Sequence, residues 1–188
     1  WVSPDAALYS QTMEARPTQN STETELAPPV ITCGVRRAAV LDSDGTITIL
    51  AVTEAVPVSR RTPILCHGPA VARRMGVAPF PARDILELFA FVRPARPCIP
   101  TASGIATALG LDRPEGLEQE ARCLSRAATL LLSELAEKKK FLRRDARLHA
   151  ITGSMELAGW PWSKAVMAAL KGTRPPKPQG IHGGLDGW

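Results

Sequence analysis

A short apolar run that ends in Cys66-His67-Gly68-Pro69 constrains the fold of this chain more than any other feature. Residues 63–67 are apolar and stop at a glycine–proline pair, which is typical of a buried parallel strand. Pro69 suits the first turn of a helix because its missing N–H is not needed there. We expect that helix to reach Met75 and to stop at Gly76. A strand followed by several helices predicts the middle of an α/β domain.

An antiparallel hairpin is expected upstream of that strand. Residues 38–41 and 46–50 are apolar runs joined by Asp42-Ser43-Asp44-Gly45. Asp-Gly between two such runs is a strong hairpin signal. Residues 30–33 can form a further short strand.

Two short helices and one long helix are expected after residue 83. Asp84 is a suitable N-cap for a helix over 85–92, since its carboxylate can accept bonds from free first-turn N–H groups. Thr101 is expected to cap a helix over 102–109. The longest amphipathic pattern covers 118–137.

The end of the chain predicts two more helices and a linker. One helix is expected over 141–157, broken or capped near Gly153, and another from a Ser163 cap to Leu170. Gly159-Trp160-Pro161-Trp162 is expected to be a turn between them. Trp160 and Trp162 could stack on bases or pack a helical corner.

Composition divides the chain into four parts. Residues 1–29 are rich in Thr, Ser, Gln, Glu and Pro, which predicts a disordered tail or linker. The α/β domain is expected over 30–137, a basic helical extension over 138–170 and a linker over 171–188. Because the first residue is Trp rather than Met, we expect a fragment of a longer protein. No apolar run approaches the ~20 residues of a membrane span, so a cytoplasmic protein without membrane contact is expected.

The net charge of +5 is unevenly distributed. Residues 1–28 hold four acidic residues against one arginine, a net charge of −3, so the rest of the chain carries +8. A basic body fits contact with nucleic-acid phosphates. The candidate contact residues are Lys138, Lys139, Lys140, Arg143, Arg144 and Arg147. The alternative is a solvated helix face.

Four side chains are weak candidates for chemistry. Asp42 and Asp44 could hold Mg²⁺, which prefers oxygen ligands, although an ordinary hairpin turn has the same residues. His67 lies at a strand end and could act as a general base, or it could be a structural residue at the helix entry. Asp84 is the fourth candidate. The four cysteines are spaced too widely for a zinc knuckle, so we expect reduced thiols.

Residues 65–111 resemble the amino-terminal region of DinG-type ATP-dependent DNA helicases of alphaproteobacteria. The stretches that carry the resemblance are CHGPAVARRMG and DILELFAFVRPARPCIPTASGIATALGL, with AGWPW and GLDGW further on. The resemblance covers about residues 38 to 188. It implies a DnaQ-like exonuclease domain of ribonuclease H-like fold, with a mixed sheet, flanking helices and a C-terminal helical extension.

The exonuclease motifs of that family are matched only in part. Asp42-Ser43-Asp44 takes the place of its Asp-x-Glu at the end of the first strand. His67-Gly68 takes the place of its His-Asn, but Ala72 stands where the aspartate belongs. Glu118 and Cys123 take the places of its third-motif His and Asp. Asp84 and Leu86 match its Asp-x-Leu helix start.

These departures predict a degenerate domain, because two-metal hydrolysis needs several converging carboxylates and a base. The resemblance implies an accessory domain that binds single-stranded DNA or docks on a helicase motor in the same chain. It would need no cofactor of its own, whereas the motor would use Mg²⁺ and ATP. An active Mg²⁺-dependent 3'-5' exonuclease that uses Asp42, Asp44 and Asp84 is one alternative. A structural protein-interaction module is another.

Overall fold

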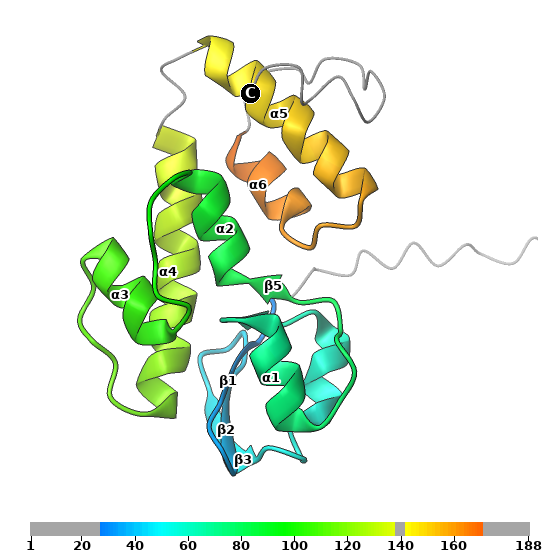
Figure 1. The fold of residues 1–188 in the computed structure, drawn as a ribbon, viewed down its shortest axis with the longest axis vertical. Coiled ribbons are helices and arrows are strands. Elements are labelled where there is room, and N and C mark those ends of the chain that lie inside the picture. The colour runs from blue at the N-terminus through cyan, green and yellow to red at the C-terminus, as the bar shows by residue number, and fades with distance from the viewer. Residues whose placement is uncertain (1–26, 138–141, 171–188) are drawn as a thin grey trace, which may run out of the picture.

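A five-stranded mixed sheet lies in the lower half of the view in Figure 1, with helices beside it and above it. The computed structural model describes residues 27–137 and 142–170. The strand order is β3-β2-β1-β4-β5. The strands are β1 (Val30–Cys33), β2 (Arg37–Leu41), β3 (Ile47–Ala51), β4 (Ile64–Leu65) and β5 (Arg83–Asp84).

The helices follow the strands in the chain. A 3-10 helix, η1 (Val56–Arg61), separates β3 from β4, and α1 (Gly68–Met75) separates β4 from β5. After the sheet come α2 (Ile85–Val92), α3 (Ala102–Leu109), α4 (Leu117–Glu137), α5 (Leu142–Leu157) and α6 (Ser163–Ala169). None of the helices in the described residues is long and apolar enough to cross a membrane.

The sheet has an antiparallel part and a parallel part. β1, β2 and β3 form an antiparallel meander, in which Val30 lies opposite Leu41 and Leu41 opposite Ile47. β1 and β4 are parallel, with Val30 opposite Ile64, and β5 continues in parallel beyond β4. The predicted hairpin and the α/β class with a mixed sheet are therefore confirmed.

Each face of the sheet has its own apolar core, because successive side chains of a strand point to opposite faces. Val30 belongs to a large core, which contains residues from α2, α3, α4 and α6. Ile31, the next residue, belongs to a small core, which contains residues from α1 and the segment around η1. The sheet therefore lies between two helical layers of unequal size.

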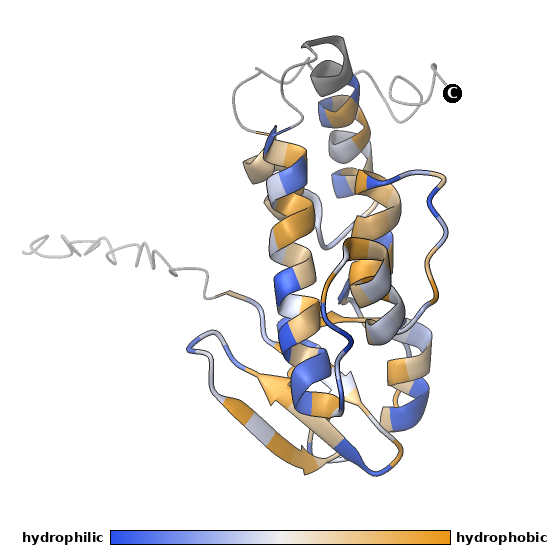
Figure 2. Ribbon diagram, turned by 90° about the vertical axis from the view of Figure 1, so that its left-hand side faces the viewer, coloured by the Kyte–Doolittle hydropathy of each residue, from blue (hydrophilic) through white to orange (hydrophobic). Residues whose placement is uncertain are grey.

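The longest helix, α4, packs across β1, β2 and β4 on the large-core side. Its buried residues recur at helical spacing, as in Ala121, Leu124, Ala128, Leu131 and Leu135. Figure 2 shows apolar and hydrophilic residues alternating along the long helices. This amphipathic pattern is the one predicted for 118–137.

The C-terminal helix α6 belongs to the same core as the sheet. Trp162, Val166 and Leu170 are buried in the large core, and α6 contacts both α4 and α5. The indole N–H of Trp162 donates to the main-chain carbonyl of Asp84 at 2.8 Å. The Arg83 guanidinium donates to the carbonyl of Pro161 at 3.3 Å. Residues 161–162 are thus fastened directly to β5.

Three expectations for local structure are corrected. The strand expected over 63–67 is reduced to Ile64–Leu65, because the chain turns at His67 into α1. The helix expected to break near Gly153 is continuous through it, since a single glycine costs only about 1 kcal/mol. Ser163 is the first residue of α6 rather than its cap, and its predecessor Trp162 makes no side-chain capping bond.

Candidate functional site

The carboxylate of Asp84 joins two helix N-termini. It accepts hydrogen bonds from the amides of His67 at 3.1 Å, Gly68 at 2.7 Å and Leu86 at 3.1 Å. The first two amides open α1, and the third opens α2. Both carboxylate oxygens are therefore occupied by backbone donors, which is the role of a capping residue rather than of a metal ligand.

His67 is the N-cap of α1 and has a left-handed backbone, with φ of 65°. Its Nδ1 atom accepts from the amide of Ala70 at 3.2 Å. Since Nδ1 acts as an acceptor, the proton of a neutral ring lies on Nε2. The structural interpretation of His67, as a residue of the helix entry, agrees with these contacts.

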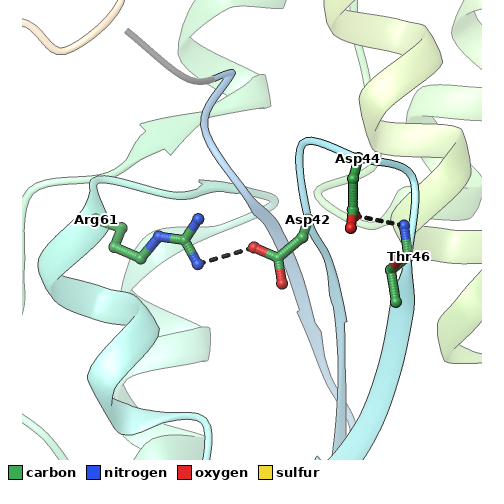
Figure 3. Close-up of polar contacts among 4 residues, drawn as sticks. All are labelled: Asp42, Asp44, Thr46 and Arg61. Carbon is green, nitrogen blue, oxygen red and sulfur yellow. Dashed lines mark hydrogen bonds and ion pairs between the residues drawn. The ribbon is translucent and has the colours of Figure 1, made fainter. Parts of the chain in front are cut away.

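Asp42 and Asp44 bind separate partners (Figure 3). Asp42 forms a 2.8 Å ion pair with Arg61, and Asp44 accepts from the amide of Thr46 at 2.8 Å. This amide bond holds the pKa of the Asp44 carboxyl below its usual value. The two carboxylates thus serve the hairpin turn and its link to η1.

The position of Asp42 in the sheet corrects the motif assignment. The first strand is β1, which ends at Cys33, whereas Asp42 follows the second strand. The residues at the end of the first strand are Thr32, Cys33 and Gly34. Thr32 Oγ1 donates to the Leu117 carbonyl at 2.8 Å. No carboxylate therefore stands where the resemblance implies the Asp-x-Glu motif.

The other exonuclease-motif positions also lack the expected chemistry. Ala72 is buried in α1, and Cys123 is buried in α4 with its thiol 3.8 Å from the Ala102 carbonyl. Glu118 is exposed in the first turn of α4. Within residues 27–137 and 142–170, no three His, Cys, Asp or Glu side chains form a group that could hold a metal ion.

Deprotonation of the thiols in this region is strongly disfavoured. Burial, together with the nearby carboxylate of Asp84, raises the pKa of Cys66 to about 12. Burial raises the pKa of Cys33 to about 11, against the opposing charge of Arg74. A thiol with a raised pKa is a poor nucleophile at neutral pH. All four cysteines of the chain are free.

Arg74 is a residue whose role the sequence did not indicate. Its guanidinium donates to the carbonyl of Cys33 at 2.6 Å, at the end of β1. It also lowers the pKa of Glu120, which burial raises. Arg74 therefore links α1, β1 and the start of α4. Its only signal in the sequence is its place in the last turn of the predicted helix.

A second feature that the sequence did not indicate is a cavity of about 670 Å³ beside the C-terminal end of α2. The Arg93 guanidinium crosses it, donating to Glu134 at 2.9 Å and to the Ala108 carbonyl at 2.9 Å. Phe89 and Val92 supply apolar lining, and Arg96 supplies a second cation. Arg93 is already paired, and its bonds form a polar link between α2, α3 and α4 beside this cavity.

The basic residues predicted to contact DNA are only partly described. Lys138, Lys139 and Lys140 lie outside the described residues, between α4 and α5. Arg143 and Arg144 belong to the first turns of α5, where the structure describes the backbone alone. Arg147 is exposed on α5. The DNA-contact hypothesis for this segment stays a prediction.

The two tryptophans have packing partners. Trp162 is 2% exposed, and Trp160 lies 5.1 Å from the ring of Phe91 and donates to Glu87 at 2.9 Å. Burial raises the pKa of Glu87, which the Trp160 bond opposes. These contacts agree with the packing interpretation.

Comparison with protein-family models, with curated proteins and with solved structures finds no match for this chain.

Proposed function

We propose that this chain is an accessory domain of a DinG-like ATP-dependent DNA helicase, and that it binds DNA or docks on the motor without cleaving DNA. The assignment to this family is supported by the stretches of sequence that resemble it. They are strongest within residues 65–111, and the resemblance covers about residues 38–188. The ribonuclease H-like part is supported by the sheet, in which a three-stranded meander continues in parallel through β4 and β5.

The lack of nuclease activity is inferred mainly from Asp84, whose carboxylate caps two helices. Two-metal hydrolysis needs carboxylates that converge on the metals. Asp84 is occupied by three amides, Asp42 is paired with Arg61 and Asp44 closes the hairpin turn. Each carboxylate thus stabilises a different part of the fold.

A nuclease assay tests this point. Incubation of the chain with end-labelled single-stranded or duplex DNA and Mg²⁺ or Mn²⁺ is expected to leave the DNA intact. Cleavage that is abolished in Asp42→Ala would establish the active-exonuclease alternative. Because Asp42 pairs with an exposed arginine, this substitution is expected to leave the fold intact.

DNA binding is tested by fluorescence anisotropy with labelled single-stranded DNA over a range of salt concentrations. We expect binding that weakens steeply as salt rises, because phosphate contacts release counterions. Undetectable or salt-independent binding would contradict the DNA-binding role. Capture of a protein partner in that case would favour the interaction-module alternative.

A further inference from the structure

The charges of the described chain separate into two parts. Residues 34–83 hold seven arginines and three carboxylates, whereas residues 84–137 hold five arginines and eight carboxylates. The first part forms the antiparallel hairpins, η1, β4 and α1, and the second forms the helices α2, α3 and α4. The sheet part of the protein is therefore basic and the helical part acidic.

Most of the basic charge lies on elements around the small core. η1 and α1 cover the same face of the sheet, since Val58 and Val71 both pack into that core. The turn between β1 and β2 is joined to α1 by the bond from Arg74 to the Cys33 carbonyl. We call the exposed arginines of these elements the arginine face. They are Arg36, Arg60, Arg61, Arg73 and Arg74, whereas Arg37 points to the large-core side with Ala39.

Most of this charge is not neutralised. Arg61 pairs with Asp42. Arg74 lies near Glu120. In the described part of the chain, no carboxylate lies in salt-bridge range of Arg36, Arg60 or Arg73, and each of these side chains is exposed. Exposed cations that face no carboxylate are available to an anionic partner.

An apolar side chain stands among these cations. The β1–β2 turn is closed by the amide of Gly34, which donates to the Arg37 carbonyl at 2.8 Å. Val35 protrudes from this turn with 89% of its surface exposed. Proteins that bind nucleic acids combine phosphate-contacting arginines with apolar side chains placed against bases. An apolar tip followed by an exposed arginine has this composition.

We propose that the arginine face, with Val35 at its tip, binds the phosphate backbone of a nucleic-acid strand. This proposal rests on the proposed DNA-binding role and assigns it to the β1–β2 turn and α1, in addition to the segment from Lys138 to Arg147. The arginines contact successive phosphates, and Val35 packs against an unstacked base.

The test compares two triple variants of the full chain that lose the same charge. Arg36→Gln/Arg60→Gln/Arg73→Gln removes three arginines of the face. The matched control, Arg113→Gln/Arg122→Gln/Arg126→Gln, removes three exposed arginines of the acidic part. The probes are labelled oligothymidine and a labelled duplex, each titrated by anisotropy from 50 to 200 mM salt.

We expect the face variant to lower the salt slope on single strands by about 2, since each phosphate contact contributes about 0.7, and to weaken binding at 50 mM salt by roughly tenfold or more. The control is expected to keep the slope of the unmodified chain. Val35→Ser is expected to weaken single-strand binding several-fold at unchanged slope. The duplex arm shows whether the face prefers paired or single strands.

An equal slope in the face variant and the unmodified chain overturns the arginine face while leaving the proposed DNA-binding role intact. Absence of binding by the unmodified chain overturns both. Equal loss in the two triple variants also overturns the face, because net charge alone then explains binding. Circular dichroism of each variant establishes that it is folded before binding is compared.

Discussion

The amide of Gly68 donates a 2.7 Å hydrogen bond to the carboxylate of Asp84, sixteen residues further along the chain. This bond crosses the parallel pair β4–β5, in which Leu65 lies opposite Asp84. One side chain thereby fixes the start of α1 relative to the start of α2. Asp84, which the sequence predicted as a helix cap and as a weak catalytic candidate, caps both helices.

Asp84→Ala is expected to lower the free energy of unfolding by about 2–4 kcal/mol, because three backbone donors lose a charged acceptor. Asp84→Asn keeps one acceptor oxygen and is expected to cost about half as much. Urea unfolding measures both. The control Asp112→Ala changes an exposed carboxylate and is expected to leave stability unchanged. Equal stability of all three variants would contradict the capping role.

Gly104→Ala is expected to destabilise the protein by more than about 2 kcal/mol, although glycine is unfavourable inside a helix. A Cβ at residue 104 would overlap the carbonyl of Ile99, which the preceding turn holds against α3. Thermal unfolding measures the loss.

Gly153→Ala is the matched control on α5. A Cβ there meets only the methyl end of Met167 at 4.0 Å, so this substitution is expected to stabilise by about 0.5–1 kcal/mol. A gain in both variants would show that α3 does not pack closely against Ile99.

Cys66 is expected to make stability fall at alkaline pH. Burial raises its pKa from 9.0 to about 12 in the folded state, so the thiol ionises more readily in the unfolded chain. Its contribution is complete below pH 9 and is lost as pH rises towards 12. Cys66→Ala is expected to show a shallower decline in unfolding free energy between pH 9 and 10.5. Parallel declines in the two proteins would contradict this role.

Trp162→Phe is expected to destabilise by about 2–3 kcal/mol, because it leaves a gap in the large core and removes the donor to the Asp84 carbonyl. Trp160→Phe removes a bond to an exposed carboxylate and is expected to cost less than 1 kcal/mol. Chemical unfolding of both variants measures the difference. The opposite order would mean that α6 is held through Trp160.

Elements with strong local signals were predictable from the sequence. The Asp-Gly turn and the caps at Asp84 and Thr101 lie where they were expected. β5 was missed because its two residues acquire strand geometry only through pairing with β4. The motif assignment of Asp42 was wrong for a related reason. Asp42 was matched to the motif because the sequence alone does not show that residues 30–33 form the first strand of the sheet.

The candidate site was less predictable than the fold. The types of its residues are evident in the sequence, but their partners come from long-range packing. The bond from Arg74 to the Cys33 carbonyl spans 41 positions, and neither residue carries a local signal for the other. The separation of charge between residues 34–83 and 84–137 was present in the sequence. It acquires meaning only once η1 and α1 are known to cover one face.

The fastening of Pro161 and Trp162 to β5 has a consequence for self-association. An edge strand can template pairing with another chain unless it is short or covered. β5 is both, because it has two residues and lies against the segment that starts α6. In the described residues no strand pairs with the outer side of β3, whose sequence ITILA carries no charge. Strand exchange or fibril growth from this sheet would therefore begin at β3.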